Sequence, residues 1–141
     1  MVKKYVAQED VMGCGVACVA NRLGISYTQA LQLFDRPGDA KTIGYKCKYI
    51  VEALRRGGVE ARLHHIKPPV RHAIISGSNP EIKGVIVLLV RSELYPYQHY
   101  LLKMPEGWID PWINMHDDPD IRQARVGVRH VLPGEPYYAI Y

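Results

Sequence analysis

The spacing of hydrophobic positions changes near residue 59. Before that point, apolar residues recur every three to four positions, which predicts helices. After it, the apolar runs are short and either alternate with polar residues or are rich in β-branched residues, which predicts strands. Three helices are expected, over residues 14–23, 26–34 and 42–56.

Particular residues mark the ends of these helices. Gly24 ends the first helix, because glycine readily adopts the left-handed conformation that follows a helix. Ser26 or Thr28 is expected to cap the second helix, and Thr42 the third. The third helix is expected to end at Gly57 and Gly58. The third helix gathers its apolar residues on one face: Ile43, Ile50, Val51 and Leu54.

The second half of the chain predicts a sheet. The continuous apolar run at residues 84–91 is typical of a central strand buried on both faces. The turn residues 105–107 join strands at 99–104 and 108–110 into a hairpin, and residues 72–76 are either a short helix or a strand. Further strands are expected at 59–66, 126–132 and 137–141. The fold class is therefore α+β, with N-terminal helices packed on a mostly antiparallel sheet.

Length, charge and cysteine content limit the function. The 141 residues fit a single domain, 1–141, that folds without disulfides or a structural metal. The net charge of +4 comes without a groove-reading motif, so we expect no nucleic-acid partner. The apolar run at 85–90 is too short for membrane insertion. Three cysteines without a signal-peptide pattern predict a cytoplasmic protein with reduced thiols; export without a signal peptide stays open.

Cys14 is the candidate nucleophile. It stands where the first helix begins, and the helix dipole and unpaired N–H groups favour a thiolate there. Gly13 and Gly15 leave room for a substrate carbonyl to approach the backbone, as acyl transfer requires. The alternative is a buried core thiol, which we expect for Cys18 and Cys47 inside their helices.

His99 and Asp110 are the candidate base and orienting carboxylate. His99 opens one strand of the predicted hairpin and Asp110 closes the other, so antiparallel pairing makes them neighbours. We expect the Nδ1–H of His99 to bind Asp110. The alternative is a surface histidine and a turn-forming Asp-Pro pair. The side-chain amide of Gln8 is expected to stabilise an oxyanion together with the Cys14 backbone N–H.

Aromatic residues surround this candidate site. Tyr97 and Tyr100 lie close to His99 in the chain, together with Tyr95, and are candidate substrate-binding residues, with core packing as the alternative. Trp108 and Trp112 flank Asp110 and are expected to cover the His–Asp pair.

A metal site or other cofactor is not expected. Cys14 and Cys18 have a Cys-x3-Cys spacing rather than the usual zinc knuckle, and His64 and His65 point to opposite faces of a predicted strand.

As a set, these residues resemble the bacteriocin-processing cysteine peptidases, which remove double-glycine leader peptides and are usually fused to an ABC exporter. The family pattern has a glutamine, then Cys-Gly-x-Ala-Cys, then a histidine that opens an apolar strand, then Asp-Pro. The matching positions are Gln8, residues 14–18, His99 with the apolar residues after it, and Asp110 before Pro111. The resemblance covers about residues 5–113.

The resemblance implies a papain-like fold and a thiol protease with Cys14, His99, Asp110 and Gln8 in the family roles. It implies a bacterial peptide or protein substrate cleaved after small residues of the Gly-Gly type, and an exporter or precursor peptide encoded nearby. Gly13 departs from the family, which commonly has aspartate there, and residues 112–141 have no family counterpart. Two alternatives stay open: a non-catalytic docking domain of the same fold, and a cysteine amidase or acyltransferase acting as a toxin or effector.

Overall fold

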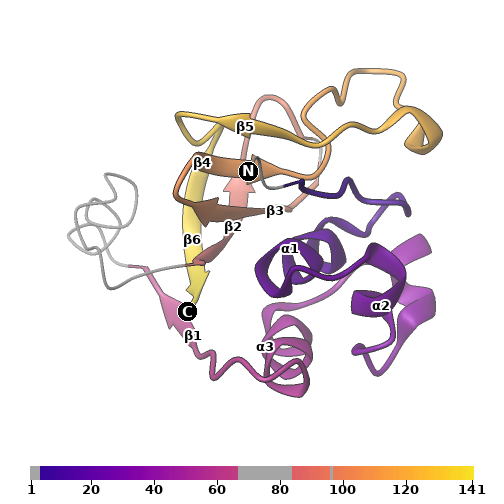
Figure 1. Cartoon of the computed structure of the whole chain (residues 1–141). Coiled ribbons are helices and arrows are strands. Elements are labelled where there is room, and N and C mark those ends of the chain that lie inside the picture. The colour runs from indigo at the N-terminus through magenta and orange to yellow at the C-terminus, as the bar shows by residue number, and fades with distance from the viewer. Residues whose placement is uncertain (1–3, 67–83, 96) are drawn as a thin grey trace.

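The computed structural model describes residues 4–66, 84–95 and 97–141. Over these residues the architecture is mixed α+β, with short helices lying on one side of an antiparallel sheet (Figure 1). The prediction for residues 72–76 lies outside the described residues. The helical elements are α1 (Cys14–Leu23), α2 (Tyr27–Leu31), α3 (Cys47–Arg56) and the 3₁₀ turns η1 (Pro37–Lys41) and η2 (Ile121–Gln123).

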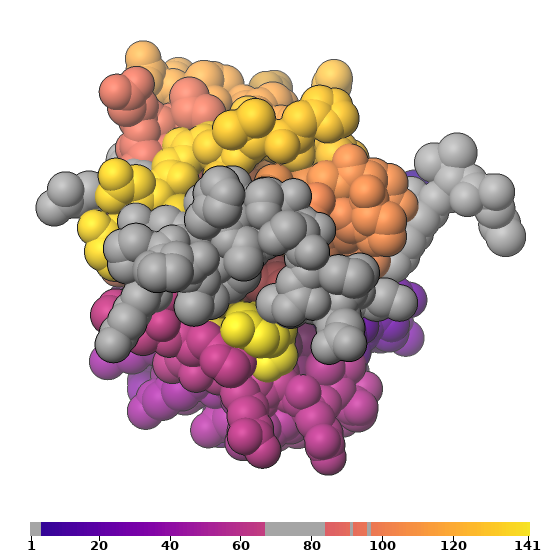
Figure 2. Space-filling model, turned by 90° about the vertical axis from the view of Figure 1, so that its left-hand side faces the viewer, coloured from indigo at the N-terminus to yellow at the C-terminus, as the bar shows by residue number. Residues whose placement is uncertain are grey.

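The sheet has the strand order β1-β6-β2-β3-β4-β5, and every neighbouring pair is antiparallel. The predicted hairpin is confirmed, because Met104 pairs with Gly107 across a turn of two residues. The chain's C-terminal end pairs with the segment around β1, and Figure 2 shows it (bright yellow) against that magenta segment. The strands are β1 (Leu63–His65), β2 (Ile86–Arg91), β3 (His99–Met104), β4 (Gly107–Asp110), β5 (Gly127–Arg129) and β6 (Glu135–Ile140).

The predicted central strand is buried on both faces. In β2, Ile86 and Leu88 belong to the core cluster that includes the helices, whereas Val87 and Leu89 pack into a second cluster on the other face. This division follows from the alternation of side chains along a strand. The sheet is therefore held between two apolar cores, and α1 packs against β3.

The first predicted helix has both expected ends, whereas the second has the expected start but ends early. Gly24 ends α1 in the left-handed conformation, with φ of 70°. Ser26, rather than Thr28, caps α2: its side chain accepts a hydrogen bond from the backbone of Gln29, whose own side chain bonds back to Ser26. The helix ends at Leu31 and not at Phe34.

The prediction for the third helix was wrong at its start. Thr42 is not the cap: α3 begins at Cys47, five positions later. Gly44 has φ of 73°, a left-handed conformation that interrupts a helix, and its N–H bonds to Asp39 as part of the preceding turn. Ile43, which was placed on the apolar face, is 71% exposed.

The predicted strand at 59–66 is also shorter than expected, because β1 covers only Leu63–His65. The N–H of Val59 bonds to the carbonyl of Leu54 near the end of α3. Residue 59 therefore still belongs to the turn that ends the helix rather than to the strand. In the part of the chain that the structure describes, no helix is both long and apolar enough to cross a membrane.

Candidate functional site

Cys14 is the first residue of α1, as predicted. Its side chain is 7% exposed, and the first helical hydrogen bond runs from Ala17 N–H to the carbonyl of Gly13. The N–H groups of the first turn lie ahead of that bond and have no acceptor within the helix, since a helix leaves its first donors unpaired. The thiol therefore lies at the positive end of the helix dipole.

Gly13 is required by the packing of the loop before α1. A Cβ atom built on it would lie 2.0 Å from the hydroxyl of Tyr27, which donates a hydrogen bond of 2.7 Å to Asp10 Oδ2. The hydroxyl occupies the space that a side chain at position 13 would need. This contact gives a physical reason why an aspartate does not fit before Cys14 in this chain.

His99 and Asp110 lie together as the hairpin predicted. His99 Nε2 is 2.9 Å from Asp110 Oδ1, and both side chains are buried. The predicted nitrogen was wrong: Nε2 and not Nδ1 binds the carboxylate. In the hairpin the His99 ring is oriented with its Nε2 atom toward Asp110. Asp110 does not engage Nδ1, and Cys14 is a further neighbour that raises the pKa of His99.

The surroundings favour the protonated imidazole. Burial on its own lowers the pKa of His99, but the hydrogen bonds and negative charges of Asp110 and Cys14 outweigh it and raise the pKa to about 9. The geometry and the charges thus favour an imidazolium between a carboxylate and a sulfur atom. Such a pair can transfer a proton to or from a substrate held at the sulfur.

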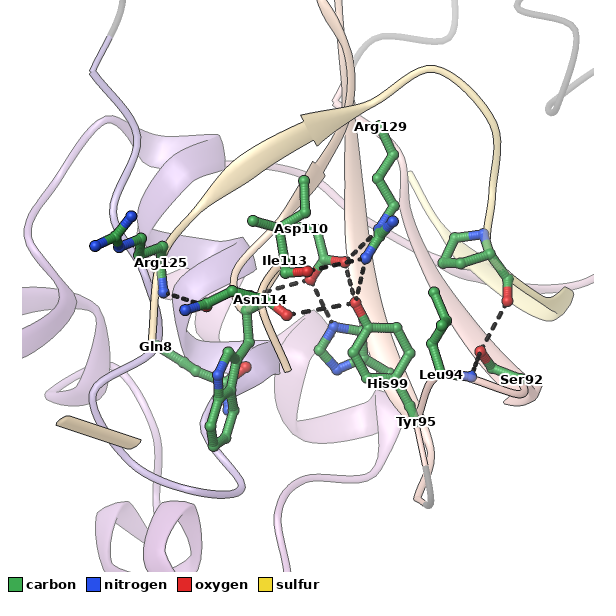
Figure 3. Close-up of polar contacts among 12 residues, drawn as sticks. Gln8, Ser92, Leu94, Tyr95, His99, Asp110, Ile113, Asn114, Arg125 and Arg129 are labelled. Carbon is green, nitrogen blue, oxygen red and sulfur yellow. Dashed lines mark hydrogen bonds and ion pairs between the residues drawn. The ribbon is translucent and has the colours of Figure 1, made fainter. Parts of the chain in front are cut away.

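The Asp110 carboxylate is fully buried and binds four donors. Oδ1 accepts from His99 Nε2 and from the Trp112 backbone N–H at 3.0 Å; Oδ2 accepts from the Tyr95 hydroxyl and from Arg129 Nε at 2.7 Å. Burial raises the pKa of a carboxyl group, yet His99, Tyr95 and Arg129 together hold the pKa of Asp110 well below its usual range. Figure 3 shows the carboxylate between the His99 ring and the Arg129 guanidinium.

Gln8 lies beside Cys14 but does not present a free donor. Its Nε2 donates to the carbonyls of Asp10 at 3.1 Å and Val11 at 3.0 Å, which uses both amide hydrogens. Its Oε1 is buried and has no partner among the described residues. The oxyanion role of Gln8 therefore needs a rotation of the amide, and it remains a prediction.

A narrow pocket of about 20 Å³ joins these groups, which is room for about one water molecule. Its lining includes Gln8, Cys14, His99 and Tyr97, the last being 69% exposed. The other lining residues are Val11, Met12, Tyr95, Gln98 and Met115.

Tyr100 does not line this pocket and is buried, which fits the alternative of core packing rather than substrate binding. It points into the core, where its hydroxyl donates to the Tyr45 carbonyl at 2.7 Å and lies 3.5 Å from Cys47 Sγ. Its position follows from strand alternation, because neighbouring residues of β3 face opposite sides of the sheet. Cys47 and Cys18 are buried, as predicted for core residues.

The two tryptophans differ. Trp112 contacts the site through its backbone N–H, which binds Asp110, whereas Trp108 packs into the core cluster on the other face of the sheet. Over the residues that the structure describes, no group of three or more metal-binding side chains comes together.

The sequence pattern did not predict the roles of two residues at the site, Tyr95 and Arg129. Tyr95 was noted only as a neighbour of His99, yet its ring stacks on the imidazole with centroids 3.8 Å apart. Arg129 was not considered, because the sequence does not show that its strand would lie beside Asp110. A scan against models of protein families finds no match to this chain, and a search of curated proteins finds none either.

Proposed function

We propose that this protein is a papain-like cysteine peptidase that cleaves a peptide bond through a thioester on Cys14. The observation that carries the proposal is the line from a thiol at a helix N-terminus, through His99, to the buried carboxylate of Asp110. A thiol needs such a base to become a nucleophile, and the base needs an orienting group.

The proposed reaction has two halves. The Cys14 thiolate attacks the peptide carbonyl, and the backbone N–H of Cys14 donates to the oxyanion. The His99 Nδ1–H protonates the leaving amine as the C–N bond breaks, and a thioester remains. Water then attacks the thioester while His99 takes its proton, and the C–S bond breaks to give a carboxylate and the free enzyme.

The resemblance to the leader peptidases favours substrates with small residues before the scissile bond. The narrow pocket at Cys14 agrees with this, because it leaves little room beside the sulfur. The amidase and acyltransferase alternatives use the same thioester: an amidase differs in the amide that is cleaved, and an acyltransferase differs in the acceptor. The docking alternative uses the pocket without chemistry.

The test is incubation with a set of synthetic peptides that includes Gly-Gly sequences, followed by mass spectrometry in water enriched in ¹⁸O. A peptidase places one ¹⁸O atom in the new carboxyl terminus, and Cys14→Ala abolishes the product. Cys18→Ala serves as the matched control, since Cys18 is a buried cysteine one turn along the same helix. A transferase yields a product joined to an added amine without ¹⁸O. No turnover by the wild-type protein, with peptide binding retained in Cys14→Ala, would leave the docking alternative.

A further inference from the structure

Arg129 is a cation next to the buried Asp110 carboxylate, and the proposed reaction gives it no role. Its Nε binds Asp110 Oδ2 at 2.7 Å, and its Nη2 donates to the Tyr95 hydroxyl and to the Ile113 carbonyl, each at 3.2 Å. The side chain is 22% exposed. One guanidinium thus connects the carboxylate, the ring stacked on His99 and the loop after β4.

The strand that carries Arg129 packs closely against the end of the β3–β4 hairpin. The residue paired with Arg129 across the strands is Trp108, and a Cβ atom on the neighbouring Gly107 would lie 2.8 Å from the Arg129 carbonyl oxygen. Gly107 has φ of 139°, which a larger residue rarely adopts. The close approach of β5 to the end of the hairpin therefore depends on this glycine.

The loop that leads to β5 is also held at several points. Asn114 accepts a hydrogen bond from the backbone N–H of Arg125 and donates one to the carbonyl of Gln123. Ile113 packs so closely on Gly127 that a Cβ atom there would lie 2.5 Å from its side chain. These contacts fix the strand from which Arg129 reaches Asp110.

We propose that Arg129 is a positioning residue that acts on His99 through Asp110 and Tyr95. Its planar fork holds the carboxylate and the Tyr95 hydroxyl in one geometry, which orients the imidazole from its edge and from its face. Its charge offsets that of Asp110, so the carboxylate orients His99 without binding its proton too tightly. The catalytic consequence rests on the proposed peptidase function, whereas the coupling between Arg129 and His99 does not.

The charges around His99 give the direction of the effect. Cys14 from α1 and Asp110 from β4 face the ring directly, Tyr95 stacks on it from the loop before β3, and Arg129 from β5 lies behind Asp110. Removal of a cation from this group leaves the negative charge of Asp110 less compensated. The imidazolium is then stabilised further, and the pKa of His99 rises above its value of about 9.

The experiment compares Arg129→Met and Arg129→Lys with Arg125→Met, which changes an exposed arginine in the loop before β5. The imidazole of His99 is titrated by NMR, and peptide cleavage and Cys14 alkylation are measured against pH. In Arg129→Met we expect the His99 midpoint to rise by about one pH unit. In Arg129→Lys we expect the midpoint to stay and kcat to fall about tenfold at unchanged KM, because the charge remains and the fork is lost.

A His99 midpoint and a pH profile in Arg129→Met equal to those of Arg125→Met would overturn the proposal. If Arg129→Met does not fold, Arg129→Lys decides, and wild-type kcat in that variant would overturn the positioning role. If the wild-type protein cleaves no peptide, the peptidase proposal fails, but the NMR titration still shows whether Arg129 acts on His99.

Discussion

Tyr95 stacks its ring on His99, with centroids 3.8 Å apart and an angle of 15° between the planes, while both residues bind the carboxylate of Asp110. The carboxylate orients the imidazole at its edge and the tyrosine limits its tilt. The two contacts are separable, because the hydroxyl and the ring can be removed in turn.

Tyr95→Phe removes the hydrogen bond to Asp110 and keeps the stacked ring. We expect kcat/KM for peptide cleavage to fall about tenfold, since a hydrogen bond to a charged group contributes about 1.5 kcal/mol. Tyr95→Ala removes the ring as well and should cost at least another factor of ten. Equal activity in the wild type and both variants would show that the tyrosine does not orient His99.

Stability should depend on pH through His99. Its pKa is about 9 in the folded protein and 6.5 without these surroundings, so its contribution is complete below pH 6.5 and is lost as the pH rises through 9. The shift corresponds to about 3 kcal/mol of unfolding free energy. Urea unfolding at pH 6.5 and pH 10 measures it, and His99→Gln should show a decrease smaller by that amount. A wild-type decrease equal to that of His99→Gln would contradict the assignment.

The pairing of Asp110 with Arg129 can be tested by a double-mutant cycle. Asp110→Asn leaves Arg129 without its counter-charge, and we expect the unfolding free energy to fall by about 3 kcal/mol. Adding Arg129→Met to Asp110→Asn should recover part of this loss, because no uncompensated cation remains. The cycle is measured by urea unfolding at neutral pH. Strictly additive losses would show that the two groups do not interact.

The packing around Gly13 predicts a rescue. Gly13→Ala places a methyl group against the Tyr27 hydroxyl and should lower the unfolding free energy by about 2 kcal/mol. Tyr27→Phe removes the oxygen at 2.0 Å and leaves the nearest ring carbon at 3.1 Å, so the double variant should be more stable than Gly13→Ala alone. Thermal unfolding of the four proteins gives the result. A double variant less stable than Gly13→Ala would show that the hydroxyl is not the obstacle.

The parts of the site that are close in sequence were the ones that the sequence predicted. The turn between β3 and β4 is short, so pairing alone brings His99 beside Asp110. Gly24 marks the end of the helix that starts at Cys14, and the thiol at its first residue was predictable from the same pattern.

Contacts between distant segments were not predictable in this way. Arg129 reaches Asp110 because β5 pairs with β4, and a hydrophobic pattern does not name the partner of an edge strand. The error at Thr42 had a local cause, because Gly44 can either lie within a helix or interrupt it, and only its observed φ decides. Nε2 of His99, and not the expected Nδ1, binds Asp110 because of the orientation of the ring, which a sequence pattern does not show.

The central claim is that the Cys14 sulfur is a nucleophile activated by His99. Its most direct test is the rate of alkylation by iodoacetamide across pH 5–10 with the adduct mapped, in the wild type and in His99→Ala. The account predicts selective labelling of Cys14 at pH 6, faster than that of free cysteine, and loss of this fast labelling in His99→Ala. Labelling of Cys14 at pH 6 no faster than that of free cysteine, and unchanged in His99→Ala, would contradict it.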